Sequence, residues 1–265
     1  MNSGNEFQSG DVQTGGTAQA AGSVKGTPAR PSILRSTTLP GITSSRLPAP
    51  GIHPVLGTPI DGPWPPGAQV IYLAAGCFWG VERIFWRQEG VLATAVGYMG
   101  GNTPNPSYEE VCTGATGHAE TVRVVFDPAV VGAGGEALLR VFWENHDSTQ
   151  LNRHGNDVGT QYRSAVWTTT PEQAAAARAI RSAFQGELTR LGRGACVTTV
   201  DDAASVYAEF GGPFYLAEDY HQAYLHKHPR GYCNHGPNGI TCPVGIVGLP
   251  AQVKVLPPLA DPTAS

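Results

Sequence analysis

The sequence has no apolar run that approaches the roughly 20 residues needed to span a bilayer. It has no basic stretch suited to a phosphate backbone, and its net charge is only -4. The N-terminus lacks a charged segment followed by an apolar one and a small-residue cleavage site, so we expect no secretory signal. These absences argue against membrane and nucleic-acid partners. They predict a soluble, neutral-to-acidic globular protein, and we expect a monomer.

Cysteine is scarce, and its number is odd: five in 265 residues. An odd, low count fits a reducing compartment better than a disulfide scaffold. Residues 1–29 carry Glu6, Asp11 and only one Lys, which is a poor match to an Arg-rich, acid-poor transit peptide. We therefore expect a cytoplasmic protein.

The two ends of the chain differ in composition from its middle. Residues 1–45 consist mostly of Gly, Ser, Thr, Ala, Gln and Pro without a hydrophobic period, so they cannot offset the entropy lost on ordering. We expect this extension to be disordered. Residues 46–243 are predicted to form one domain, of which residues 46–67 are an extended arm, and residues 244–265 a C-terminal tail.

Hydrophobic periodicity within the domain predicts alternating strands and helices. Strands are expected over residues 70–74, 91–96, 120–126, 162–168 and 197–200. Helices are expected after the first strand, over residues 136–146, from residue 171 onward and over residues 214–228. This order predicts an α+β sandwich with a mixed, mostly antiparallel sheet and helices packed on it.

Cys77 lies between the first predicted strand and the helix that follows it. A free cysteine is usually a small buried hydrophobe, and this is the alternative interpretation. At a helix start, however, unpaired N–H groups and the helix dipole favour a thiolate and lower the thiol pKa from about 8.5 toward neutrality. Gly76 and Gly80 allow close approach of the backbone. We therefore predict that Cys77 is a nucleophile with a lowered pKa.

Glu120 begins the third predicted strand. Because alternate residues of a strand share a face, Glu120 lies on the face of Val122, Val124 and Phe126. A carboxylate on an apolar face is desolvated, which raises its pKa and keeps it protonated near neutrality, as a general acid must be. The alternative is a glutamate at a strand end that reaches solvent.

Two further cysteines, Cys233 and Cys242, lie in a segment rich in Gly, Pro and Asn. Such a loop is expected to be flexible and exposed and to bury a thiol poorly. Together with Cys77 they would form a thiol relay, in which the first cysteine is oxidised, the second resolves it as a disulfide and the third passes the disulfide on. Cys112 and Cys196 are expected to be packed and inert.

A zinc site is an alternative use of these cysteines. Four histidines lie near them in the sequence: His221, His226, His228 and His235. Zinc sites usually draw on short C-x2-4-C or H-x3-5-H pairs, whereas eight residues separate the two cysteines here. We expect no metal.

The run G-C-F-W-G-V-E, residues 76–82, resembles the active-site signature of the peptide methionine sulfoxide reductase A (MsrA) family. The similarity continues through "GYMGGNTPNPSYEEVCTGATGHAETVRVVFDP", "VFWENHDSTQLNRHGNDVGTQYRSAV", "TPEQAAAARA" and "PFYLAEDYHQAYLHKHPRGYC", and covers roughly residues 68–243. The resemblance implies a ferredoxin-like two-layer α+β plait and reduction of methionine S-sulfoxide, free or in proteins, with thioredoxin as reductant and no other cofactor.

The resemblance also implies roles for the residues around the sulfoxide. Cys77 would attack the sulfoxide sulfur, and Glu120 would protonate its oxygen. Phe78 and Trp79 would form the apolar wall that receives the methyl group.

Further roles implied by the family concern oxygen binding and thiol recycling. Tyr108 and Tyr162 would hold the sulfoxide oxygen, and Asp157 would support the site through hydrogen bonds. Cys233 would resolve the sulfenic acid, and Cys242 would take over the disulfide for thioredoxin. The segment before Cys242 is about one residue longer than the commonest family version, so a two-cysteine cycle stays open.

Two alternative hypotheses from other functional classes remain. A cysteine-dependent acyl-transfer hydrolase would pair Cys77 with His118 or His221, but no spacing selects either histidine. A catalytically silent module that binds oxidised methionine is the third reading. Turnover of sulfoxide, turnover of ester, or binding without turnover separates the three.

Overall fold

A six-stranded mixed sheet organises the computed structural model, which describes residues 39–210 and 214–242. The strand order is β7-β6-β1-β3-β2-β8, and all neighbours are antiparallel except β6 and β7. The strands are β1 (Gln69–Ala75), β2 (Val91–Met99), β3 (Ala119–Phe126), β6 (Ser164–Thr168), β7 (Thr199–Asp202) and β8 (Tyr215–Leu216). A separate two-stranded sheet pairs β4 (Arg153–His154) with β5 (Asp157–Val158).

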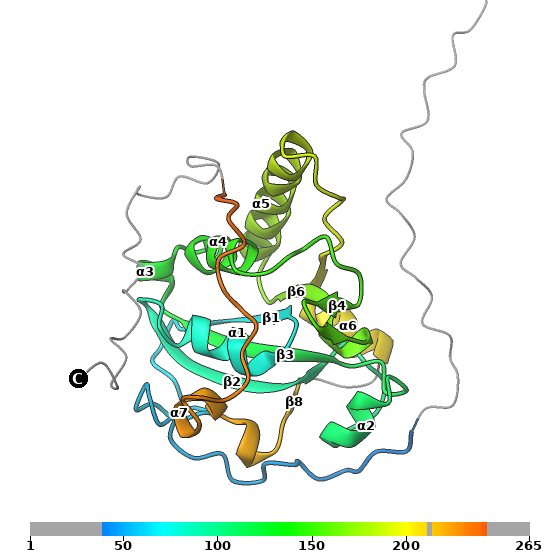
Figure 1. The fold of residues 1–265 in the computed structure, drawn as a ribbon. Helices are drawn as coiled ribbons and strands as arrows, with labels where there is room; N and C mark the ends of the chain where they lie inside the picture. The colour runs from blue at the N-terminus through cyan, green and yellow to red at the C-terminus, as the bar shows by residue number, and fades with distance from the viewer. Residues whose placement is uncertain (1–38, 211–213, 243–265) are drawn as a thin grey trace, which may run out of the picture. The chain divides into compact units, whose positions relative to one another are not determined.

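The helices flank this sheet (Figure 1). They are α1 (Phe78–Phe85), α2 (Tyr108–Cys112), α3 (Pro128–Val131), α4 (Glu136–Glu144), α5 (Pro171–Arg190), α6 (Ala203–Phe210) and α7 (Tyr224–Lys227), with 3-10 turns at Thr160–Tyr162 and Asp219–His221. The inner strands β6-β1-β3-β2, with α1 and α4, follow the β-α-β-β-α-β order of a ferredoxin-like plait. The predicted α+β class with a mostly antiparallel sheet is confirmed.

Helices α1, α4 and α5 share one hydrophobic core with one face of the sheet. Phe85 of α1, Phe142 of α4 and Phe184 of α5 are buried in it. From β3 the same core takes Val122, Val124 and Phe126, which confirms the predicted alternation along this strand. Glu120, two residues before Val122, therefore points toward the helix that follows Cys77.

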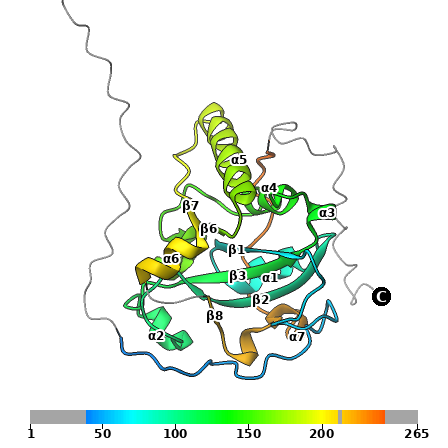
Figure 2. The same cartoon turned by 180° about the vertical axis from the view of Figure 1, so that it is seen from behind.

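The opposite face of the sheet, which is turned toward the viewer in Figure 2, has its own hydrophobic core. Here Leu47 and Ile60, from the segment before β1, pack with Trp167 of β6. Arg123 of β3 binds the segment before β1. Its guanidinium lies 2.7 Å from the Asp61 carboxylate and donates a hydrogen bond to the Ile60 carbonyl at 2.8 Å.

The start of α5 follows the sequence signals. Pro171 occupies the first turn, and the side chain of Thr170 accepts a hydrogen bond from the Gln173 N–H at 3.2 Å. The short helix α2 was not predicted, although Ser107 and Glu110 form the capping box that its S-Y-E-E sequence encodes.

The helix predicted over residues 214–228 is wrong. The segment forms β8, a 3-10 turn and the single turn α7. Gln222 interrupts it, because its side-chain amide binds both the N–H and the C=O of Val96 in β2. Ala223 has a φ of +49°, and its N–H donates to the buried Glu82 carboxylate at 2.9 Å. These long-range bonds replace the bonds of a continuous helix.

The expectations for residues 1–38 and 244–265 lie outside the described residues. Residues 39–45 are described, and the Ile42 N–H donates to the Pro104 carbonyl at 3.0 Å. Among the described helices, none is long and apolar enough to cross a bilayer.

Candidate active site

Cys77 is the last residue before α1 and follows the end of β1. Gly76 between them has a φ of +99°, a conformation that favours glycine. A Cβ on Gly76 would lie 2.5 Å from the Cβ of His154, so the close approach also requires glycine. The chain therefore turns sharply and delivers Cys77 to the N-terminus of α1, where the side chain is 6% exposed.

The pKa of the Cys77 thiol is raised, not lowered. Burial is the larger cause, and the charge of Glu120 adds to it. Hydrogen bonds from the backbone of Trp79 and Gly80 lower the pKa, but by less. The prediction of a pKa near neutrality is therefore wrong for the resting protein, because desolvation of the sulfur outweighs the helix N-terminus. Cys77 is a protonated thiol at neutral pH.

Glu120 is 2% exposed and lies beside Cys77. Its Oε2 accepts a hydrogen bond from the Phe78 N–H, the first of α1, at 2.9 Å. Burial raises the pKa of Glu120 to about 8, although this hydrogen bond lowers it. The predicted protonated carboxyl on an apolar face is confirmed. The site thus holds two protons at neutral pH, one on the thiol and one on the carboxyl.

Tyr108 and Tyr162 reach the same place from α2 and from the turn before β6. Both are half-buried, and both pKa values are raised, first by burial and next by the charge of Glu120. Cys77 contributes to the rise at Tyr162, and Tyr162 contributes to the rise at Tyr108. Two phenol groups that remain protonated thus lie near the thiol and the carboxyl.

Aromatic rings line the other side of the site. Phe78 is buried, with its ring centroid 5.0 Å from that of His221. Trp79 donates its indole N–H to His221 Nδ1 at 3.0 Å and stacks on Tyr224 at a centroid distance of 3.8 Å. The ring of Tyr108 lies 4.8 Å from His221. The two residues predicted as an apolar wall therefore adjoin the oxygen-bearing side chains.

Asp157 of β5 binds the C-terminal segment rather than α1. Its carboxylate accepts hydrogen bonds from the Tyr232 hydroxyl at 3.0 Å and the Asn234 amide at 2.9 Å. Burial, followed by the hydrogen bond to Asp157, raises the pKa of Tyr232 to about 12, and the charges of Cys77 and Cys233 contribute. Tyr232 is thus close to both sulfurs.

Cys233 lies over the first turns of α1. A Cβ added to Gly80 would lie 3.0 Å from the Cys233 sulfur and 2.4 Å from Nδ1 of His235. His235 in turn binds the Ala75 carbonyl through Nε2 at 2.7 Å. In Figure 1 this segment, coloured orange to red, crosses in front of α1 toward α4 and α5. The structure therefore brings Cys233 to the helix that begins after Cys77.

Cys242 is not part of this cluster. It is 3% exposed, and its N–H donates to a carboxylate oxygen of Glu144 in α4 at 2.9 Å. Burial, followed by the charge of Glu144, raises the pKa of Cys242 to about 12. The prediction of an exposed, flexible loop is wrong here, because the segment packs against the α4 and α5 side of the molecule.

The two remaining cysteines, both predicted to be packed, differ in exposure. Cys196 is buried, as predicted. Cys112 at the end of α2 is exposed, so its predicted packing is wrong. All five cysteines are free thiols.

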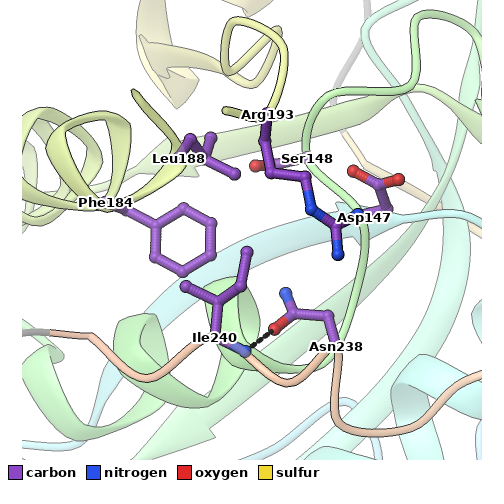
Figure 3. A pocket seen from close by; sticks show the side chains of 7 residues that line it. All are labelled: Asp147, Ser148, Phe184, Leu188, Arg193, Asn238 and Ile240. Atoms are coloured by element: carbon purple, nitrogen blue, oxygen red, sulfur yellow. Dashed lines mark hydrogen bonds between the residues drawn. The ribbon is translucent and has the colours of Figure 1, made fainter. Parts of the chain in front are cut away.

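A cavity of about 200 Å³ lies next to the segment that carries Cys242. Figure 3 shows Phe184 and Leu188 of α5 on one side of it and Asn238 and Ile240 on another. The remaining lining residues are Asp147, Ser148 and Arg193. This cavity is lined by none of the predicted site residues.

Two alternative uses of the histidines, a metal site and His118 as a base for Cys77, lack support in the described residues. Within the described part of the chain, no group of three or more His, Cys, Asp or Glu side chains is placed to hold a metal ion. His118 Nδ1 accepts from the Gly101 N–H at 3.1 Å, and its Nε2 lies 2.7 Å from the Thr103 carbonyl. Because both of its nitrogens are hydrogen-bonded elsewhere, His118 has none free for the thiol, which disfavours a hydrolase that pairs Cys77 with His118.

Sequence reasoning missed the residues that hold Cys233, above all Arg83 and His235. Arg83 donates to the Cys233 sulfur at 2.9 Å. One signal was available: Gly80 and Arg83 are three residues apart in a helix and so share a face. The sequence does not predict which residue contacts that face, since Cys233 is 150 residues away.

A family model described as peptide methionine sulfoxide reductase matches residues 69–241. A peptide methionine sulfoxide reductase MsrA from Salinispora arenicola is 57% identical over 202 residues, which are 76% of this chain and 87% of the relative. The enzyme named peptide methionine sulfoxide reductase MsrA 1 from Caulobacter vibrioides is 52% identical over 210 residues, 79% of this chain and 92% of the relative.

Solved structures give the same picture. Methionine sulfoxide reductase A of Corynebacterium diphtheriae superposes with a TM-score of 0.68 at 44% identity, covering 77% of this chain and 94% of that one. The reduced form of Mxr1 from Saccharomyces cerevisiae superposes with a TM-score of 0.56 at 30% identity, covering 64% of this chain and 92% of that one.

Proposed function

The chain belongs to the peptide methionine sulfoxide reductase family and is an oxidoreductase of methionine sulfoxide, and from this premise we propose how its residues carry out the reaction. The substrate is the S epimer of methionine sulfoxide, free or within oxidised proteins, and the product is methionine. The biological role is repair of oxidative damage.

The first step transfers the sulfoxide oxygen to Cys77. A sulfoxide sulfur is a poor electrophile until its oxygen is protonated, so the neutral Glu120 donates its proton to that oxygen. The Cys77 sulfur attacks the sulfoxide sulfur and forms an S–S bond, and the thiol proton returns to the carboxyl. The hydroxyl then moves from the substrate sulfur to the Cys77 sulfur, as the S–S bond and the S–O bond to methionine break. Cys77 leaves this step as a sulfenic acid, and methionine is released. The balance needs no external acid or base.

The raised pKa of Cys77 fits this scheme. A charged Glu120 would repel a thiolate, and the charge of Glu120 is one cause of the rise. The thiol therefore gives up its proton only when the carboxyl has passed its own to the substrate. Because these two proton transfers are coupled, the Cys77 sulfur becomes nucleophilic only when a sulfoxide is bound.

Aromatic and phenolic groups would select the face of the chiral sulfur. Tyr108 and Tyr162 remain protonated and can donate to the oxygen, whereas Phe78 and Trp79 can accommodate only the methyl group. Hydrogen-bond donors on one side and an apolar wall on the other distinguish the S epimer from the R epimer.

The second step forms a disulfide. Cys233 attacks the sulfenic sulfur of Cys77, the S–S bond forms, and water leaves. Asp157 supports this step through Tyr232 and Asn234, which flank Cys233. Cys242 then undergoes thiol–disulfide exchange with this bond, which frees Cys77 and leaves a disulfide between Cys233 and Cys242. Thioredoxin reduces that disulfide.

We further propose a cytoplasmic monomer that requires thioredoxin but no metal, nucleic acid or membrane. Five free thiols support a reducing compartment. Oxidised proteins and free methionine sulfoxide are the expected substrates.

The observation that carries the proposal is the position of a protonated, buried Glu120 at the N–H of Phe78, next to Cys77. The test compares S and R sulfoxides with wild type and with Cys77→Ser, by thioredoxin-coupled oxidation of NADPH. We expect turnover of the S epimer by wild type only. Turnover of the R epimer, or activity in Cys77→Ser, would contradict the proposal.

A further inference from the structure

Arg83 is in contact with the sulfur of Cys233. Its Nη2 donates to this sulfur at 2.9 Å from the last turn of α1. Within the described residues, Arg83 forms no salt bridge with a carboxylate. The positive charge at the Cys233 sulfur is therefore not compensated by an acid.

A second arginine adds to this charge. Arg87 lies four residues after Arg83, beyond the end of α1, and its Nε is buried without a hydrogen-bond partner. Burial and the charge of Arg83 lower the pKa of Arg87, and the Cys233 sulfur raises it, so the guanidinium is near this sulfur. Burial lowers the pKa of the adjacent His235 to about 3, so its imidazole is neutral. The charge beside Cys233 comes from arginine.

We propose that Arg83 is a further catalytic residue, which acts in disulfide formation and not in sulfoxide reduction. This proposal rests on the proposed function, because it requires a sulfenic acid on Cys77. The Cys233 thiol loses its proton, its sulfur attacks the sulfenic sulfur, and the S–O bond breaks. The hydroxyl leaves with a proton as water. Arg83 orients the attacking sulfur and stabilises its negative charge.

The geometry explains why an arginine stands at this position. A hydrogen bond from a cation to an anionic sulfur is stronger than the same bond to a neutral thiol, so it favours the attacking form. The guanidinium also fixes the direction of the sulfur, which a flexible ammonium does less well. Lysine should therefore rescue charge but only part of the orientation.

The experiment follows a single turnover of the reduced full-length enzyme with one equivalent of free methionine S-sulfoxide and no reductant. Rapid quenching measures methionine by chromatography, sulfenic acid by trapping with a nitrobenzofurazan chloride, and disulfide by loss of free thiols. The variants are Arg83→Met, Arg83→Lys and the control Arg178→Met, which removes an exposed arginine from α5.

In Arg83→Met we expect methionine to form at the wild-type rate while disulfide formation slows at least about tenfold, which corresponds to about 1.4 kcal/mol of barrier. Arg83→Lys should lie between the two proteins. Arg178→Met should match wild type. Disulfide formation within twofold of wild type overturns the proposal.

A second measurement tests the proposal even if the Arg83→Met protein fails to fold. Both proteins carry Cys77→Ser, and one of them also carries Arg83→Gln. Peptide mapping compares the rate at which iodoacetamide alkylates Cys233 in the two proteins at pH 7. Slower alkylation without the guanidinium supports the proposal, and equal rates overturn it. If the wild type forms no methionine in the single turnover, the proposed function fails, and the alkylation rates still decide whether Arg83 activates Cys233.

Discussion

The sulfur of Cys233 lies 3.0 Å from the point where a Cβ on Gly80 would stand. Gly80 is in the middle of a helix with an ordinary negative φ, so its backbone does not require glycine. What requires it is the C-terminal segment, because His235 lies closer still, at 2.4 Å. Absence of a side chain here allows the Cys233 thiol to lie on the helix that begins after Cys77.

Gly80→Ala should separate the two chemical steps. Alanine favours a helix by about 1 kcal/mol, but its Cβ would displace Cys233 and His235. Because the Gly80 N–H is kept, methionine formation should stay within a few-fold of wild type. Disulfide formation should slow at least about tenfold in the single-turnover experiment.

Gly186→Ala is the matched control for this variant. Gly186 is also helical, in α5, and a Cβ there would meet no atom within 4 Å. The variant should be slightly more stable and unchanged in both steps. Unchanged disulfide formation in Gly80→Ala would show that Cys233 reacts from another position.

The rate of methionine formation should depend on the protonation of Glu120. Since its pKa is about 8, the rate should be constant below that pH and fall as pH rises through it. The raised pKa of Cys77 means that no thiolate appears in this range to compensate. Rapid quenching across pH 6 to 10 would measure this, and a rate that rises through pH 8 would contradict the assignment.

Glu120→Gln should remove both the activity and its pH dependence. General acid catalysis contributes about 10²–10⁴-fold, so methionine formation should fall by roughly that factor. Glutamine keeps an oxygen that can accept the Phe78 N–H, so the helix start should be preserved. Methionine formation by Glu120→Gln at near the wild-type rate would contradict the role of this carboxyl as general acid.

The same substitution should stabilise the protein at high pH. The native state holds the Glu120 proton up to about pH 8, whereas the ordinary pKa of a glutamate side chain is 4.5. Between these values the native state binds more protons than the unfolded chain, so its stability falls as pH rises. Glu120→Gln lacks this loss, and its Tm should exceed that of wild type by roughly 5 °C at pH 9.

Calorimetry at pH 6 and pH 9 would measure the difference, with Glu89→Gln as the control. Glu89 is exposed, so its substitution should shift Tm equally at both pH values. A gap between Glu120→Gln and wild type that narrows from pH 6 to pH 9 would contradict the linkage argument.

Asn238 should control access to Cys242. Its amide nitrogen donates to the carbonyls of Trp143 and His146 at 2.7 Å each. Its amide oxygen accepts from the Ile240 N–H at 2.8 Å, the hydrogen bond drawn in Figure 3. These bonds hold Cys242 in the core, so a relay through Cys242 needs them to break. Asn238→Ala should increase the alkylation rate of Cys242 by roughly tenfold or more, because each bond contributes about 1 kcal/mol.

Cys196 provides the internal reference for that measurement. It is buried but belongs to another segment, so peptide mapping should find its alkylation unchanged. Equal reactivity of Cys242 in wild type and Asn238→Ala would mean that other contacts keep it buried.

Local signals in the sequence were sufficient for five strands of the sheet, β1, β2, β3, β6 and β7, for helices α1, α4 and α5, and for the face of β3 that carries Glu120. Strand alternation depends only on the backbone period, which is why Val122, Val124 and Phe126 fall in one core as predicted. The raised pKa of Glu120 followed from the same pattern, since an apolar face desolvates any carboxylate on it.

Only the tertiary structure decided the state of the two thiols and the course of the C-terminal segment. The pKa of Cys77 depends on how completely its surroundings exclude water, and the loop composition around Cys242 does not reveal α4 and α5 beneath it. The helix expected over residues 214–228 failed for the same reason, because Gln222 and Ala223 bind residues more than a hundred positions away. A sequence period records local geometry, whereas desolvation and long-range hydrogen bonds exist only once the chain has folded.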